Sequence, residues 1–137
     1  MSLFNVLDVA SSGMTAQSTR LNVTASNLAN AENTAGTADA VYKPRHPVFS
    51  AILREMGADN NAVGVQVDNI VEDNVDPRRL YQPQNPQADQ AGYVYAANVN
   101  SVEEMANMIS ASRSYQMNVD VMNTAKQLLL RTLQIGE

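Results

Sequence analysis

The 137-residue sequence contains no cysteine and no tryptophan, and it has a single histidine, His46. Without cysteine the chain cannot form disulfides, use a thiol nucleophile or bind a metal through sulfur. With one histidine it cannot build a metal site that needs two imidazole ligands, and most acid–base pairs are excluded as well. Only two phenylalanines and five tyrosines are present. The large rings that usually fill a compact core are therefore scarce.

Positive charge and long apolar runs are also in short supply. Nine Lys and Arg residues stand against 14 Asp and Glu residues, which gives a net charge of −5. Because a nucleic-acid-binding protein needs a basic face, this balance argues against that class. No stretch reaches the ~20 apolar residues of a membrane span, so we expect no membrane insertion. Asp8, Ser11 and Ser12 interrupt the first apolar stretch. We therefore expect no cleaved secretory signal, and export would need another route.

Residues that could carry chemistry are few. His46 lies in a proline-flanked stretch and is interpreted as a solvated loop residue. Glu72, Asp73 and Asp76 lie close together, but they lack the spaced oxygen ligands and the glycine of a calcium loop. A solvated acidic loop is the favoured interpretation. The sequence has no phosphate-binding loop, dinucleotide fingerprint or nucleophile elbow. We expect a protein that is not an enzyme and that uses no cofactor or metal.

Residues 1–35 show apolar or small side chains at alternating steps of three and four. They are Phe4, Leu7, Ser11, Met14, Ser18, Leu21, Ala25 and Leu28. This spacing predicts a helix with one coiled-coil-like seam. Several β-branched residues and Gly13 lower its intrinsic propensity, so the helix should depend on packing. The small residues Ser11, Ser12 and Gly13 favour the close approach of a second helix.

Residues 98–137 predict a second helix. The first row comprises Met105, Met108, Ser112, Tyr115, Val119, Met122, Leu129 and Leu133, and a second row comprises Val102, Ile109, Gln116, Asn123 and Leu130. Ser101 and Glu104 fit an S-x-x-E capping box, which predicts the start of the helix. Lys126 and Arg131 suit the negative end of the helix dipole. Gly136 is predicted to end the helix.

The middle of the chain, residues 36–97, holds all five prolines. Val63, Val65 and Val67 alternate with less apolar residues, which predicts a half-buried strand after a turn at residues 57–61. Residues 93–95 predict another strand, and we expect the middle to consist of short strands and turns. The predicted fold class is mainly α with a small β insert. Long helices in 1–35 and 98–137 pack in a coiled-coil-like manner, and 36–97 form a short, loop-rich β subdomain.

Periodicity does not show whether the helical rows pack within one chain or between chains. An intramolecular helical hairpin and an intermolecular coiled coil both satisfy it. The helix faces are rich in Asn, Gln and Ser and poor in charge, which favours burial between subunits over exposure to solvent.

Distinct motifs occur along nearly the whole chain. They are residues 26–31 (SNLANA) with Asn33 and Thr34, residues 42–43 and 47–49, residues 81–94 (YQPQNPQADQAGYV), residues 98–100 (NVN), residues 103–105, residues 112–118 (SRSYQMN) and residues 132–136 (TLQIG). Together they resemble the flagellar axial proteins, and the middle run and short length are similar to the rod subunits of that family. Gln84 and Asn85 depart from the family's glycine and histidine, so the geometry of that turn is not carried over.

The resemblance implies a structural subunit of the proximal rod of the flagellar basal body. Such proteins are exported unfolded through the flagellar type III export apparatus and polymerise helically into a drive shaft across the periplasm. The implied partners are further copies, other rod subunits and the junction of the rod base with the MS ring. The predicted subunit-interface residues are Leu7, Met14, Leu21, Leu28, Asn30, Met105, Ile109, Tyr115, Val119, Met122, Leu129 and Leu133. The alternatives are another axial protein and a soluble adaptor whose helices pair within the monomer.

Overall fold

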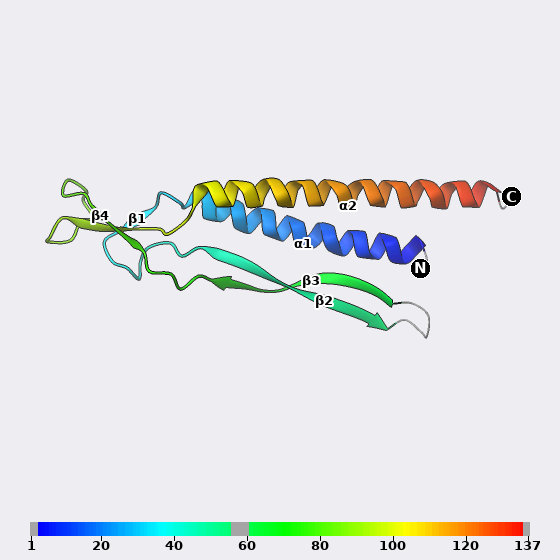
Figure 1. The fold of residues 1–137 in the computed structure, drawn as a ribbon, viewed down its shortest axis with the longest axis horizontal. Helices are drawn as coiled ribbons and strands as arrows, with labels where there is room; N and C mark the ends of the chain where they lie inside the picture. Colours follow the sequence, from blue (N-terminus) through cyan, green and yellow to red (C-terminus); the bar gives the residue numbers. More distant parts are fainter. Residues whose placement is uncertain (1–2, 56–60, 136–137) are drawn as a thin grey trace.

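The computed structural model describes residues 3–55 and 61–135 of the chain (Figure 1). Two long helices dominate it: α1 covers Leu3–Ala29 and α2 covers Ser101–Ile135. The helices run antiparallel and side by side, and the C-terminal end of α2 extends beyond the N-terminal end of α1 (Figure 1). The predicted fold class, two long terminal helices around a small β insert, is confirmed. Gly136, the predicted end of the second helix, lies outside the described residues.

Small residues line the contact between the two helices. Ala10 and Ala16 are buried on α1, and Ala111 and Ala125 are buried on α2. Because alanine buries little apolar area, the interior of this helix pair contributes little stabilisation per residue. Gly13 permits a close approach of α2 at Asn118, so the predicted packing role of the small residues near position 12 is confirmed there.

A long antiparallel hairpin runs along α1 (Figure 1). It consists of β2 (Arg45–Glu55) and β3 (Asn61–Glu72). The register shifts between Val48 and Phe49, where Asp68 has no partner on β2. The predicted strand is confirmed, but the expectation of short strands is wrong here. Pairing along the whole hairpin and contact with α1 are long-range effects that the local pattern does not reveal. Residues 57–60 of the predicted turn lie outside the described residues.

A second, smaller sheet lies beyond the C-terminal end of α1 (Figure 1). Its strands are β1 (Thr34–Ala35), β4 (Arg78–Tyr81) and β5 (Tyr93–Ala96), in the antiparallel order β1-β5-β4. The predicted strand at residues 93–95 is therefore confirmed. A small buried cluster lies beside this sheet and consists of Ala31, Val41, Ala97 and Val99, with Ala35, Tyr42 and Tyr95 packed against it.

The turn that departs from the family pattern is organised by Asn85. Its backbone N–H donates to the Gln82 carbonyl at 3.0 Å. Its side-chain Nδ2 donates to Gln82 Oε1 at 3.0 Å, and its Oδ1 accepts from the Gln87 N–H at 3.0 Å. Asparagine side chains stabilise turns in this way by replacing backbone partners. The substitution thus supplies its own turn chemistry.

Candidate functional site

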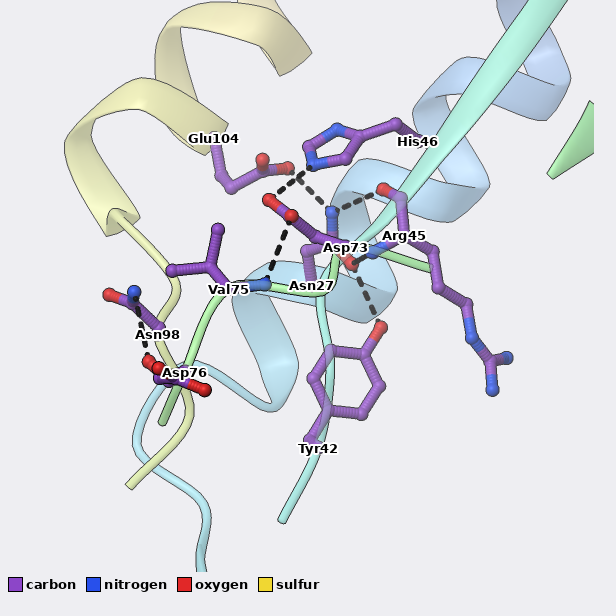
Figure 2. A network of polar contacts seen from close by, with 9 residues as sticks. All are labelled: Asn27, Tyr42, Arg45, His46, Asp73, Val75, Asp76, Asn98 and Glu104. Carbon is purple, nitrogen blue, oxygen red and sulfur yellow. Dashed lines mark hydrogen bonds and ion pairs between the residues drawn. The ribbon is translucent and has the colours of Figure 1, made fainter. Parts of the chain in front are cut away.

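The two helices and the hairpin meet at the buried side chain of Asn27 (Figure 2). Its Oδ1 accepts hydrogen bonds from the Tyr42 hydroxyl at 2.8 Å and from the Arg45 backbone N–H at 2.9 Å. Its Nδ2 donates to the Arg45 carbonyl at 2.8 Å and to Glu104 Oε2 at 3.2 Å. A carboxamide has two donor hydrogens and two acceptor positions, so every one is used. One side chain therefore links α1, the start of β2 and α2.

The residues after Asn27 end α1 and direct the chain into the sheet. Asn30 Nδ2 donates to the Ser26 carbonyl at 2.8 Å, and the Asn30 backbone N–H donates to the same carbonyl at 3.2 Å. The Asn33 carbonyl accepts from the Ala97 N–H at 3.0 Å, and Ala31 is buried in the small cluster. The SNLANA motif thus forms the junction between α1 and β1.

The start of α2 is capped by Asn100. Its Oδ1 accepts from the backbone N–H groups of Val102 at 3.2 Å and Glu103 at 3.4 Å. The predicted capping box of Ser101 and Glu104 is therefore wrong by one residue. Asparagine and serine are comparable caps, so local sequence alone does not choose between them. Glu104 is only 5% exposed, and its carboxylate takes part in the network at the helix junction instead.

A row of α1 residues at steps of seven faces α2. Gly13 lies against Asn118, Arg20 Nη2 donates to Asn107 Oδ1 at 3.0 Å, and Asn27 bonds Glu104. Residues seven apart lie on nearly the same face of a helix. The polar contacts of the helix pair thus follow one heptad position, which a pattern of apolar residues does not reveal.

The hairpin is attached to α1 at a second point, Ser12. The Ser12 hydroxyl accepts from the Val65 backbone N–H at 3.2 Å and donates to the Val9 carbonyl at 2.8 Å. A Cβ on Gly64 would lie 3.3 Å from Ser12 Oγ, so a small residue keeps β3 close to the helix. The local sequence identifies Ser12 as a small residue, but it does not reveal this partner on β3.

Two parts of the chain match known flagellar families. Residues 7–36 match the family described as flagella basal body rod protein, and residues 90–135 match the one described as flagellar basal body rod FlgEFG protein C-terminal. The chain is 47% identical to the flagellar basal-body rod protein FlgC of Yersinia enterocolitica, with both chains fully covered. The chain belongs to the flagellar basal-body rod proteins. Relatives of the same description are 45% identical in Escherichia coli O6:H1 and 37% identical in Bacillus subtilis, again with full coverage.

As a flagellar basal-body rod protein, the chain is a structural subunit of the proximal rod and not an enzyme. This confirms the family resemblance and replaces the alternative of a soluble adaptor. Within the described residues, neither helix has the length and apolar character needed to cross a membrane.

The charged residues near Asn27 in this rod protein form exposed pairs. Arg45 and Glu72 lie 2.9 Å apart, and His46 Nε2 lies 3.9 Å from Asp73 Oδ2, with each side chain about two-fifths to one-half exposed. Such pairs contribute little to stability. The part of the chain that the structure describes holds no group of three or more metal-binding side chains.

The predicted interface residues of the rod protein fall into two groups. Met105, Ile109, Tyr115 and Leu133 are exposed, all on α2. The others are partly buried: Leu7, Met14, Leu21, Leu28, Asn30, Val119, Met122 and Leu129. The helices do pair within the chain, yet this pairing leaves much of the predicted apolar surface uncovered. Their role between subunits stays a prediction.

Proposed function

We propose that this rod subunit polymerises through apolar rows on its terminal helices, with further copies of itself and with other rod subunits. The observation that carries the proposal is the exposed apolar surface of α2. Ile109 is 56% exposed and Leu133 is 69% exposed, although both lie on a regular helix that is already paired with α1. Monomeric proteins rarely expose contiguous apolar surface of large extent, so this surface fits a subunit that is covered by neighbours.

The exposed apolar residues occur on more than one side of α2. Val102, Met105 and Ile109 follow one another at steps of three and four, while Met117, Val121 and Leu128 follow a second row. Helices that pack against several neighbours carry several such rows. We infer that α2 contacts two neighbouring helices in addition to α1.

The apolar row of α1 supports the same proposal. Met14, Leu21 and Leu28 each directly follow a residue of the heptad row that faces α2, and Leu7 lies seven residues before Met14. All four side chains are partly buried. This row lies beside the face of α1 that contacts α2. A neighbouring helix would cover the part of these side chains that α2 does not cover.

The terminal helices and the middle segment have different roles in this arrangement. We propose that residues 1–35 and 98–137 build the inner tube of the rod and that residues 36–97 lie outside it. The same proposal includes export through the type III apparatus, contact with the junction at the MS ring and torque transmission across the periplasm. Ordering costs ~1–2 kcal/mol per residue, and a helix interior built from alanine returns little of it. Contacts with neighbours would supply the remainder, which couples folding to assembly.

The experiment that tests this proposal is an Ile109→Asp variant with Ala106→Asp as its matched control. Both residues are exposed on α2, but Ala106 lies seven residues before the exposed Arg113, on a charged part of the helix surface outside both apolar rows. We expect Ile109→Asp to retain the helix content of the purified parent chain, measured by circular dichroism, and to abolish swimming in cells that lack the parent gene. Ala106→Asp should swim. Normal swimming of the Ile109→Asp cells would overturn the role of this row. Leu21→Asp and Leu129→Asp should also abolish motility, but these side chains are partly buried and can disturb the fold.

A further inference from the structure

The hairpin has little interior of its own. Val48, Phe49, Ile70 and Val71 are all more than one-third exposed. A two-stranded hairpin is marginally stable in water unless it packs against something else. In this structure it packs along α1 (Figure 1). Its place therefore depends on how firmly it is attached to the helix.

Asn27 provides the attachment at the base of the hairpin. Its carboxamide bonds both backbone groups of Arg45, the first residue of β2, and in this way imitates a neighbouring strand. The side chain is 1% exposed, so water cannot replace a lost partner easily. The same amide group also bonds Glu104 of α2.

The contact with Glu104 lets α2 reinforce the orientation of the carboxamide. The Arg45 N–H requires Oδ1 and the Arg45 carbonyl requires Nδ2, so the backbone of Arg45 already favours one orientation (Figure 2). A Glu104 carboxylate only accepts hydrogen bonds, so it stabilises that same orientation through Nδ2. The orientation that bonds Glu104 is also the one that holds the start of β2.

We propose that Asn27 is a positioning residue that couples the pairing of α1 with α2 to the docking of the β2–β3 hairpin. A subunit whose α2 has not yet paired would hold its hairpin loosely, and pairing would then fix it along α1. The inference rests on the proposed function only where it treats helix pairing as a step of assembly. The coupling itself is a property of the single chain.

The test is amide hydrogen exchange of the full chain, measured residue by residue by NMR. The reporter is the Val65 N–H, which bonds Ser12 and belongs to β3, far along the hairpin from Asn27. The reference is Val23, a buried residue within α1. We expect Asn27→Ala and Glu104→Ala each to accelerate exchange at Val65 by about tenfold or more, and to do so beyond any change at Val23.

The matched control is Asn107→Ala. It removes a hydrogen bond between the same two helices, the one from Arg20, without touching Asn27. We expect exchange at Val65 to stay within about twofold of the parent chain in this variant. Unchanged exchange at Val65 in Asn27→Ala would overturn the proposal. Equal acceleration at Val65 and Val23 would also overturn it, because it would report general unfolding.

A rescue experiment separates positioning from simple packing. Asn27→Asp has nearly the same shape, but it places a carboxylate against Glu104 and removes the donor for Arg45. In Asn27→Asp/Glu104→Gln the new amide can donate to the new carboxylate, so we expect part of the protection at Val65 to return.

If the purified chain shows no protected amides, the same two variants are compared by swimming. Better swimming of the double variant supports the coupling, and equal loss overturns it. Because the exchange experiment needs no assembly, it can fail or succeed independently of the Ile109→Asp result.

Discussion

Gly13 of α1 lies so close to Asn118 of α2 that a Cβ on the glycine would come within 2.8 Å of Asn118 Nδ2 and 3.2 Å of Asn118 Cγ. The same face of α1 carries the Arg20 contact with Asn107 and the Asn27 contact with Glu104. The two helices are thus held in register by polar side chains and small residues. The large apolar side chains of α2 remain available on other faces.

The close approach at Gly13 predicts a dependence on side-chain size. Glycine in a helix costs ~1 kcal/mol relative to alanine, so Gly13→Ala should gain stability through its higher helix propensity. The new Cβ should displace Asn118, and this displacement should offset the gain. We expect little net change in the free energy of unfolding. Gly13→Ala/Asn118→Ala removes the clash and should be more stable than Asn118→Ala alone by about 0.5–1 kcal/mol. Gly13→Leu should be less stable than the parent by about 1–3 kcal/mol. Urea denaturation followed by circular dichroism measures each value. A Gly13→Leu chain as stable as the parent would contradict the close approach.

The cap of α2 predicts different costs at two adjacent positions. Asn100→Ala removes the acceptor for the first N–H groups of the helix and should lower the free energy of unfolding by about 1 kcal/mol. Ser101→Ala is the control, since Ser101 is already within the helix and should cost less than about 0.5 kcal/mol. Thermal unfolding measured side by side distinguishes the two. A larger loss of unfolding free energy for Ser101→Ala than for Asn100→Ala would show that Ser101 is the cap.

The turn before β5 predicts a requirement for glycine at position 92. Gly92 has a φ of 81°, and a Cβ there would lie 2.9 Å from Tyr81 Cε2 and 3.2 Å from Pro83 Cβ. We expect Gly92→Ala to lower the free energy of unfolding by about 1–3 kcal/mol, through left-handed backbone strain and displacement of the Tyr81 ring. That ring packs edge-on against Tyr93, with centroids 5.2 Å apart, so the near-ultraviolet circular dichroism should change as well. The exposed neighbour Ala91, changed to Ser, should leave both signals unchanged. An unaltered tyrosine signal in Gly92→Ala would show that the turn tolerates a side chain.

The helices were predictable because their signals are local. Steps of three and four, capping residues and the absence of proline place helices near Leu3–Ala29 and Ser101–Ile135 without any knowledge of neighbours. The motifs that carry the family resemblance are likewise contiguous in sequence, and the family that they indicated is the one to which the chain belongs. The two main errors, the cap of α2 and the length of the hairpin strands, concern features on which local patterns are ambiguous.

The sequence by itself determined that this protein has two amphipathic terminal helices, little positive charge and a composition without thiols or paired histidines. Only the tertiary structure decided that Glu104 faces Asn27, that Ser12 holds β3 and that Arg20 of α1 bonds Asn107 of α2. Each of these contacts joins residues more than fifty positions apart. A helical period shows which residues share a face, but it carries no information about which distant segment will cover that face.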